Sequence, residues 1–462
     1  MSDEMDERLT ENEINEIDGI GDEAEDPDEV ISDKNSKKKI FWRPQDFSIR
    51  ELNFMKTDND LDLRPQYQRN FVFDKTKASR LIESILLEVP IPVLYFAEEA
   101  NGKFSVIDGQ QRLTSFLGFV NGQFPVGNSL TDFALSGLEM LTELNKKTFA
   151  DLDQDLQLKI KSTALHTIII KNESDEDAKF EIFERLNTGS VKLNEDEIRN
   201  SVYRGPYIDL LNELSNDKTF ESLVRKPNFK NRMLYRGMIL RFLALSEKDI
   251  HLYRPSMKQY CNKELREHRN LSQAKADEYR KRFRKSVDLC RSVFGENAFR
   301  RFVIGKENEK NGGWVASRIN MALFDVQMCG FAMYDQNKIQ GHWDEIREAM
   351  LYLMCNDQEF SNAIELKTSG TEQMNTRFKK WIDTLDGIVK GTPPLPRVFP
   401  YAVKKQLFET DRTCKLCGNQ IMAIEDAEVD HITPYSQGGT TTLENAQLAH
   451  RYCNRHKSNN TA

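Results

Sequence analysis

The sequence contains no apolar run that approaches the length of a membrane span, which excludes a spanning helix. Its acidic start also lacks the basic residues and apolar core of a secretory signal. We therefore expect a cytoplasmic protein with no membrane partner. Hydrophobic residues make up 39% and aromatic residues 10% of the 462 residues, which is typical of a globular protein with two or three domains.

Cysteine is scarce, and the odd number of seven argues against a disulfide framework. Cys261, Cys290, Cys329 and Cys355 lie far apart in helical-looking stretches, where we expect inert buried thiols. Only the three cysteines near the C-terminus have the spacing of metal ligands.

Basic residues are almost absent from the first 33 residues, where Arg8 faces about fifteen acidic residues. Since the net charge is -8, the remainder of the chain is mildly basic, at about +6, and compatible with DNA binding. The start also lacks aromatic residues, so we expect residues 1–40 to form a disordered acidic tail. Two roles fit such a tail: solubilising the protein, or competing with DNA for a basic groove.

The C-terminal stretch carries two pairs with the spacing of zinc ligands. Cys414-x2-Cys417 is followed about 30 residues later by His450-x2-Cys453, which is typical of a tetrahedral zinc site. If the last segment is a helix, His450, Cys453, Asn454 and Lys457 share one face. His456 is a rival fourth ligand, and four unrelated surface residues remain the alternative interpretation.

Residues suited to catalysis lie between and beside these pairs. Asp430 and Asn454 offer oxygen ligands for Mg²⁺ or Mn²⁺, and His431 offers an imidazole that titrates near neutrality and suits a general base. On an extended segment the adjacent Asp430 and His431 point in opposite directions, one toward a metal and one toward a water. A polar turn with a solvated histidine is the alternative.

Together these residues resemble the HNH endonuclease module of the zinc-containing, McrA-like type, over about the last 50 residues. The resemblance implies a ββα-metal fold in which His431 is the general base, Asp430 and Asn454 bind the catalytic metal, and Asn445 braces the loop behind the histidine. It also implies a Cys3His zinc shell, with His450 where the module usually has cysteine. The motifs that carry it are Cys414 to Gly418, Val429 to Gly439, Leu443 to Leu448 and Cys453 to Lys457.

Three basic residues extend from the same C-terminal segment: Arg451, Arg455 and Lys457. We expect them to contact DNA phosphates, which positions the backbone without reading sequence. An ordinary solvated basic face explains them equally well.

Residues 41–207 mix short strands with helices, which indicates an α/β or α+β domain. We predict helices at 75–89 and 113–120 and strands at 93–96, 104–107 and 166–170. Two further helices are predicted to begin at Ser174 and at Asn194, each with an acidic residue three positions on. The first predicted helix has an apolar stripe formed by Ala78, Leu81, Ile82, Ile85, Leu86 and Val89.

A polar turn, Asp108-Gly109-Gln110-Gln111-Arg112, separates the second predicted strand from its helix. A glycine turn at a helix start exposes amide donors to an anion, Arg112 adds a fork for phosphate, and Asp108 offers a cation ligand. An arginine paired with a neighbouring carboxylate explains the same pattern.

With other segments, this turn resembles the DGQQR domain of GmrSD-type restriction enzymes, which is related to ParB and sulfiredoxin. The resemblance implies a ParB-like fold in which Asp108, Gly109, Gln110, Gln111 and Arg112 bind a nucleoside triphosphate and Gln68 and Arg69 complete the pocket. It implies a sensor attached to a nuclease, with NTPase activity as an additional expectation. The other segments are Leu63 to Arg69, Ile91-Pro92, Phe183 to Gly189 and Asn194 to Asn200.

Residues 208–390 have apolar residues at helical spacing, notably at 233–245, 315–333 and 343–354, and we expect a helical domain. Its basic stretches, Lys281 to Lys285 and Arg300-Arg301, either line DNA or form solvated helix faces. The proline-rich residues 391–401 indicate a stiff linker that sets the nuclease module, residues 402–462, apart.

The sequence thus predicts an α+β protein in which a ParB-like sensor domain, a helical domain and a zinc-containing HNH module follow one another. We expect a modification- or nucleotide-responsive DNA endonuclease of the phage-defence type, acting on base-modified phage DNA. A nucleotide-gated DNA-binding regulator and an effector nuclease that attacks host DNA or RNA are the alternatives. A homodimer or two sequential nicks would let one HNH site cut both strands.

Overall fold

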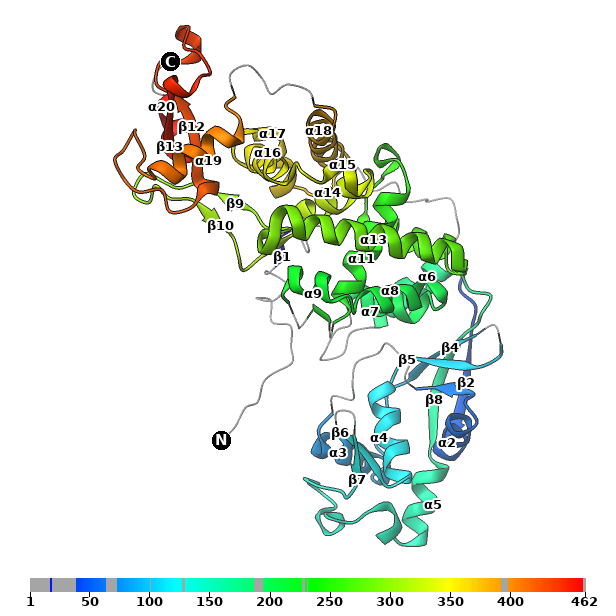
Figure 1. Ribbon diagram of the computed structural model, residues 1–462. Coiled ribbons are helices and arrows are strands. Elements are labelled where there is room, and N and C mark those ends of the chain that lie inside the picture. Colours follow the sequence, from blue (N-terminus) through cyan, green and yellow to red (C-terminus); the bar gives the residue numbers. More distant parts are fainter. Residues whose placement is uncertain are drawn as a thin grey trace. The chain divides into compact units, whose positions relative to one another are not determined.

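The computed structural model describes residues 17–18, 39–63, 73–99, 101–126, 129–186, 194–226, 229–230, 232–391 and 398–459 (Figure 1). The chain divides into two compact units. One comprises Asp33–Ile208 with Asn228–Leu234, and the other comprises Met1–Ser32, Asp209–Pro227 and Tyr235–Ala462. Among the described residues, no helix is both long enough and apolar enough to cross a membrane.

The first unit is built on a five-stranded mixed sheet with the order β2-β8-β4-β5-β3. Strand β8 pairs antiparallel with β2 and parallel with β4, and β5 pairs antiparallel with β4 and parallel with β3. A separate hairpin is formed by β6 and β7. The strands are β2 Trp42–Ser48, β3 Leu61–Asp62, β4 Leu94–Glu98, β5 Phe104–Asp108, β6 Gln123–Val126, β7 Ser129–Asp132 and β8 Ala164–Ile170.

Helices α2 Ile49–Thr57, α3 Lys75–Leu86, α4 Gln110–Val120 and α5 Gln154–Ser162 belong to the same unit (Figure 1). Their apolar residues share one core with the inner face of the sheet, including Ile82, Phe96, Leu113 and Ile169. The chain continues through α6 Glu176–Leu186, α7 Glu195–Val202 and α8 Pro206–Leu214. The mixture of strands and helices confirms the predicted α+β class.

The predicted helix at 75–89 is shorter in the structure, because α3 ends at Leu86. Glu88 has a left-handed φ of 58°, which breaks the helical backbone before Pro90. As a result Ile82 and Ile85 are buried as the stripe predicted, whereas Val89 is 50% exposed. The stripe therefore ends one turn earlier than predicted.

The two predicted helix starts have different outcomes. Asn194 and Glu197 form the predicted capping box of α7. Ser174 instead bonds through its hydroxyl to the backbone N–H and C=O of Phe41, and Asp175 accepts from the N–H groups of Asp177 and Ala178 at the start of α6. The cap of α6 is therefore one residue later than predicted, because Ser174 is used in a long-range contact.

The second unit is mostly helical before residue 400, as predicted (Figure 1). Its central helix α14 Met321–Ala332 is buried on every side, and Asp325 within it accepts from Arg241 and Arg377. Cys261, Cys290, Cys329 and Cys355 are buried, as expected. The helices are α9 Lys218–Val224, α11 Leu234–Glu247, α12 Met257–Glu267, α13 Gln273–Phe294, α14, α15 Gln336–Ile339, α16 Trp343–Asn356, α17 Gln358–Glu365 and α18 Thr371–Val389.

Short strands interrupt this helical region. Strands β9 Phe302–Val303 and β10 Gly313–Trp314 form an antiparallel pair, and β1 Ile17–Asp18 pairs in parallel with β11 Ile319–Asn320. The predicted helical pattern at 315–333 therefore becomes a helix only from Met321 onward. Apart from residues 17–18 and 39–40, the expected acidic tail lies outside the described residues.

The C-terminal part of the second unit consists of α19 Tyr401–Thr410, the antiparallel hairpin β12 Ala427–His431 and β13 Ala446–His450, and α20 Arg451–Asn459. Phe408, Ile421, Ala427 and Leu448 form its small core. Within the unit, this part contacts the helical region: Lys404 pairs with Glu348, and Asn311 bonds to the backbone of Gln420 and Met422. Residues 392–397 of the expected linker lie outside the described residues.

Candidate active site

A strand hairpin followed directly by a helix positions the C-terminal polar residues. In the hairpin Asp430 lies opposite Gln447 and His431 lies opposite Ala446. The chain passes from His450, the last residue of β13, to Arg451, the first residue of α20, without a loop. Ligands on the strand end and on the helix are thus held by one continuous backbone.

The four predicted zinc ligands come together. The Sγ atoms of Cys414, Cys417 and Cys453 and a ring nitrogen of His450 all lie within 4.8 Å of one another. Cys414 and His450 are fully buried, and Cys453 is nearly so. The backbone turns sharply at Gly418, whose left-handed φ of 78° suits glycine. Three thiols and one imidazole in this arrangement fit a structural zinc site.

The histidine of this cluster is oriented by a second contact. Nε2 of His450 lies 3.3 Å from the carbonyl O of Gln420, while Nδ1 lies 3.5 Å from Sγ of Cys417 and 3.8 Å from Sγ of Cys453. When Nε2–H donates to the carbonyl, the lone pair of Nδ1 faces the thiols, which is the tautomer that binds zinc. The donor set and its orientation therefore both fit the metal.

The thiols show the electrostatic cost of gathering three cysteines. Burial raises the pKa of the Cys414 thiol, but N–H donors from His450, Cys417 and Leu416 outweigh burial and hold that pKa below its usual value. Burial, together with Cys417 and Cys414, raises the pKa of the Cys453 thiol far above its usual value. Three thiolates side by side repel one another, so a cation is needed to keep all of them deprotonated.

The rival ligand His456 does not join the cluster. Its ring stacks on Tyr452 at 5.7 Å between centroids, and its side chain is exposed on α20. Because His450 ends β13 while His456 lies in the second turn of the helix, only His450 can reach the thiols.

Two residues of α20 contact two acidic residues of β12. Nδ2 of Asn454 donates to Oε2 of Glu428 at 2.9 Å, and Nζ of Lys457 donates to Oδ2 of Asp430 at 2.8 Å. Asn454 and Lys457 are three residues apart on the helix, and Glu428 and Asp430 are two residues apart on the strand. Each spacing places its two side chains on one face of its element. Asp430, which also accepts from Gln447 at 2.7 Å, therefore lies on the same face as Asn454.

His431 lies on the opposite side of β12 from Asp430. Its Nε2 lies 3.2 Å from Oγ1 of Thr441, and its ring lies 4.5 Å from the ring of Phe399 and 5.8 Å from that of Tyr435, centroid to centroid. Burial lowers the pKa of His431, Lys457 lowers it further, and Asp430 opposes both. The imidazole is thus neutral at pH 7 and able to accept a proton.

Asn445 closes the loop between the two strands. Its Oδ1 accepts from the N–H of Thr433 at 2.8 Å, and its Nδ2 donates to the carbonyls of Thr433 and Thr440 at 3.1 and 2.8 Å. Its own carbonyl accepts from the N–H of Ile432. Gly439 passes so close to the carbonyl of Thr433 that a Cβ there would lie 1.9 Å from the oxygen. The loop that follows His431 is therefore tied at both ends.

The three predicted DNA-binding residues have different environments. The expectation for Arg451 is wrong, because its side chain is only 1% exposed and pairs with Glu348 and Glu428. Lys457 is partly exposed and bound to Asp430 and to the carbonyl of His431. Arg455 is exposed and donates to Oδ1 of Asn356. Of the three, Arg455 is therefore exposed on helix α20 and Lys457 partly so.

The polar turn of the first unit lies between β5 and α4. Gly109 has a left-handed φ of 97°, and a Cβ there would lie 2.2 Å from the side chain of Leu94. Arg112 pairs with Asp108 at 2.6 Å and also donates to the carbonyls of Pro92 and Val93. Arg112 therefore holds the turn against the segment before β4. The alternative interpretation of this turn, an arginine paired with a neighbouring carboxylate, accounts for much of its sequence.

The structure describes only some of the other residues of the expected nucleotide pocket. Gln110 begins α4, and Oε1 of Gln111 accepts from the N–H of Phe73. Gln68 and Arg69 lie outside the described residues. The structure thus places the Asp108 to Arg112 half of the expected pocket.

The basic stretches of the helical region are mostly engaged within it. Arg300 is 1% exposed and donates to backbone carbonyls, including those of Leu223 and Ala298. Arg301 pairs with Glu365, and Arg282 pairs with Glu247. Burial excludes Arg300 from DNA contact and weakens the expectation for its neighbours.

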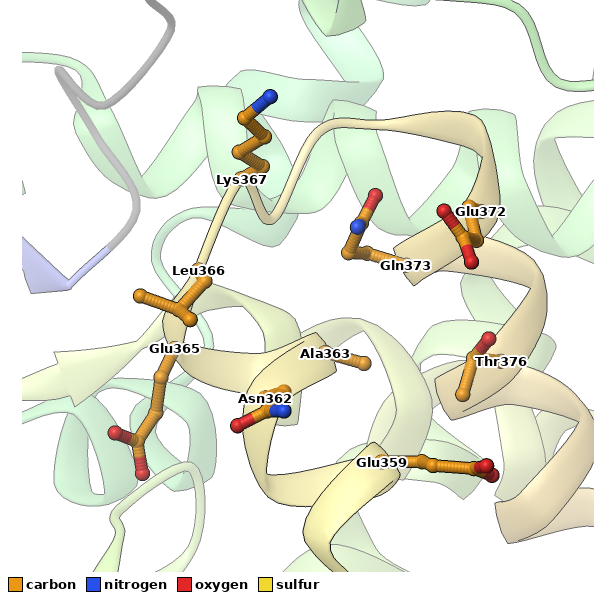
Figure 2. Close-up of a pocket in the computed structure, with 9 residues that line it drawn as sticks. All are labelled: Glu359, Asn362, Ala363, Glu365, Leu366, Lys367, Glu372, Gln373 and Thr376. Carbon is orange, nitrogen blue, oxygen red and sulfur yellow. The ribbon is translucent and has the colours of Figure 1, made fainter.

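A surface cavity lies between α17 and α18, far along the chain from the hairpin (Figure 2). In Figure 2 Lys367 and Glu365 point in opposite directions, and Glu365 is already paired with Arg301. The polar groups that line the cavity do not converge on one point, whereas those of a ligand site do. The lining residues are Glu359, Asn362, Ala363, Glu365, Leu366, Lys367, Glu372, Gln373 and Thr376.

Sequence reasoning missed Glu428, Gln447, Thr441 and Phe399, all of which contact the predicted site residues. Glu428 was within reach of a sequence argument, because it lies two positions before Asp430 on a predicted extended segment and so shares its face. Phe399 carries no such signal, since it belongs to the proline-rich segment for which the sequence predicts only a linker.

Two family models match this chain. Residues 49–204 match the family described as GmrSD restriction endonuclease, N-terminal domain, and residues 414–460 match the family described as HNH endonuclease. The two matches together give the domain architecture of the GmrSD-type fusion and identify a nuclease. No curated protein matches the chain.

Proposed function

We propose that this chain, which joins a GmrSD-type N-terminal domain to an HNH endonuclease domain, is a metal-dependent DNA endonuclease of the modification-dependent restriction type. The observation that carries the proposal is the placement of His431 and Asp430 on opposite sides of the end of β12, with Asn454 on the Asp430 side. A nuclease of this kind needs a base for water and oxygen ligands for a hard cation.

The oxygens of Asp430 and Asn454 would hold a Mg²⁺ or Mn²⁺ ion. Carboxylate and amide oxygens are the donors that such ions prefer, and both residues lie on the face of β12 covered by α20. The ion supplies charge stabilisation for the leaving 3′ oxygen. The chain itself orients the two donors through a rigid hairpin and helix.

His431 would accept the proton of the attacking water. When its Nε2–H donates to Thr441, the unprotonated nitrogen is Nδ1, and we assign the proton transfer to that atom. Asn445 would hold the loop after His431 in place through its bonds to Thr433 and Thr440. The zinc cluster would fix the start of α20, since His450 and Cys453 flank it.

The first unit would act as a nucleotide-responsive sensor. Support comes from the Gly109 turn at the start of α4, where helix N–H groups suit an anion, and from the half-exposed carboxylate of Asp108. Binding of a nucleoside triphosphate by wild type and by Gln110→Ala tests this assignment without disturbing the Asp108–Arg112 pair. Equal binding by the two proteins, or none by wild type, would remove the nucleotide from the proposal; release of phosphate would add NTPase activity.

Cleavage by wild type, His431→Ala and His456→Ala tests the nuclease assignment. His456 is the matched control, because it is an exposed histidine of the same module outside the proposed site. Plain DNA, base-modified phage DNA and RNA, each with Mg²⁺ or Mn²⁺, serve as substrates. We expect cutting of modified DNA that His431→Ala loses and His456→Ala keeps. Preferential cutting of RNA or host DNA would favour an effector nuclease, and binding without cutting would favour a regulator.

A further inference from the structure

Arg451 is a fully buried arginine at the first position of the helix that carries Asn454. Its Nε donates to the carbonyl of Glu425 at 2.6 Å, one terminal nitrogen donates to Oε1 of Glu428 at 2.9 Å, and the other donates to Oε1 of Glu348 at 2.6 Å. A buried guanidinium must be paired on every side, so these acceptors hold the helix start in one place.

Glu428 links Arg451 to Asn454, the proposed metal ligand. Its Oε1 accepts from Arg451, and its Oε2 accepts from Nδ2 of Asn454 at 2.9 Å. The two ends of an amide differ, since only the oxygen binds a cation. By accepting from Nδ2, Glu428 selects the orientation of Asn454 in which Oδ1 is turned away from Glu428.

Two of the supporting residues come from α16, which lies outside the hairpin-and-helix module. Glu348 accepts from Arg451 and from Nζ of Lys404 at 2.7 Å, and Asn356 donates to Oε1 of Glu428 at 3.0 Å. Burial raises the pKa of Glu348, but the charges of Arg451 and Lys404 outweigh it, so this carboxylate stays ionised and the network stays charged. Helix α16 therefore acts on both sides of the Arg451–Glu428 pair.

We propose that Glu428 and Glu348 are positioning residues for phosphodiester cleavage: α16 holds Arg451 through Glu348, Arg451 holds Glu428, and Glu428 orients Asn454 toward the catalytic cation. The proposal rests on the function assigned above to Asn454. It makes the helical region part of the nuclease, so that a displacement of α16 changes metal affinity at the active site. Residues that orient metal ligands from behind typically alter metal affinity by about 10-fold to 100-fold when they are changed.

The test uses the full chain with Glu428→Gln and Glu348→Gln, which keep the size of each side chain and remove its charge. The matched control is Asp357→Asn, which removes the charge from a half-buried ion pair with Lys380 in the same helical region without contact to α20. Asparagine still caps α17 at this position. For each protein we would measure Mn²⁺ binding by titration calorimetry, zinc content, unfolding temperature and cleavage rate.

We expect Glu428→Gln and Glu348→Gln to weaken Mn²⁺ binding by roughly 10-fold or more. Each variant should keep its zinc, and Asp357→Asn should bind Mn²⁺ as wild type does. Because the effect passes through Asn454, Glu348→Gln should cause no further loss in an Asn454→Ala background. Unchanged Mn²⁺ affinity in both variants would overturn the proposal, as would loss of zinc, additive effects with Asn454→Ala, or no Mn²⁺ binding by wild type.

His431→Ala separates this proposal from the proposed function. It should abolish cleavage and leave Mn²⁺ binding intact, because His431 lies on the other side of β12. If wild type cut no nucleic acid while Glu428→Gln still weakened Mn²⁺ binding, the nuclease assignment would fail, and Glu428 would still orient Asn454 toward a bound cation.

Discussion

Nζ of Lys457 lies 2.8 Å from Oδ2 of Asp430 and 3.1 Å from the carbonyl O of His431. One ammonium thus contacts both residues of the Asp-His pair that the sequence marks as catalytic. Its position three residues after Asn454 on α20 makes this contact possible, since both side chains face β12. The contact also sets Lys457 in competition with any cation that Asp430 binds.

Lys457→Met should tighten Mn²⁺ binding. The variant removes a positive charge beside Asp430, and a partly exposed pair of this kind contributes about 0.2–1 kcal/mol, so we expect roughly a 1.5-fold to 5-fold gain in affinity. Calorimetric titration measures it. Arg455→Met is the control, because Arg455 lies on the same helix and bonds to Asn356 instead. Weaker Mn²⁺ binding by Lys457→Met would show that Lys457 supports the site.

Cys414→Ser should abolish zinc binding and unfold the hairpin-and-helix module. Structural zinc contributes about 10 kcal/mol or more, which is comparable to the whole free energy of unfolding of a small domain. Zinc content and proteolysis of residues 402–459 measure the two effects. Cys261→Ser changes a buried thiol outside the cluster and should leave the zinc content as in wild type. A full zinc content in Cys414→Ser would contradict the assigned ligand set.

Asn445→Ala should loosen the loop that follows His431. The variant loses three side-chain hydrogen bonds, each with a net contribution of about 0.5–1.5 kcal/mol, and an exposed site favours the lower end of that range. We expect faster amide exchange in residues 432–445 and roughly 10-fold slower cleavage, because His431 is held less firmly. Gln437→Ala, an exposed change in the same loop, is the control. Unchanged exchange would contradict the brace.

Asp426→Asn should stabilise the protein more at pH 7.5 than at pH 5. Burial raises the pKa of Asp426 from 3.8 to about 6, and the charge of Glu428 adds to the rise. The N–H of Gly312 and the charges of Arg451 and Lys404 lower this pKa but do not outweigh burial. The folded state therefore binds more protons than the unfolded state between about pH 4 and 6, and stability falls as the pH rises through that window.

Asparagine removes this dependence because it does not titrate. The measurement is the unfolding temperature of both proteins from pH 5 to 7.5, with the difference between them growing as the pH rises. A constant difference over this range would show that Asp426 does not titrate there. Gln437→Ala, an exposed change that involves no titratable group, is the control, and its offset from wild type should stay constant over the same range.

The C-terminal site could be predicted from sequence because its information is local. Paired ligand spacing specifies the zinc set, and the period of two along a strand places Asp430 and His431 on opposite faces. Much of the N-terminal fold was accessible for the same reason, since β-branched runs and amphipathic periods predicted β8 and α3. The end of α3 was not, because the helix ends at Leu86 and the left-handed backbone at Glu88 breaks it before Val89, the last residue of the predicted stripe.

Tertiary structure determined which polar and charged side chains bind partners inside the protein. The sequence places Arg451 with Arg455 and Lys457 as one more basic residue for DNA, yet Glu348, distant in the sequence, pairs with it in the interior. The side chains of Arg300 and Ser174 likewise donate hydrogen bonds to backbone carbonyls that are distant in the sequence. Local sequence determines which side chains share a face of a helix or strand. Only the packing of distant segments determines which of those faces meets solvent and which meets a buried partner.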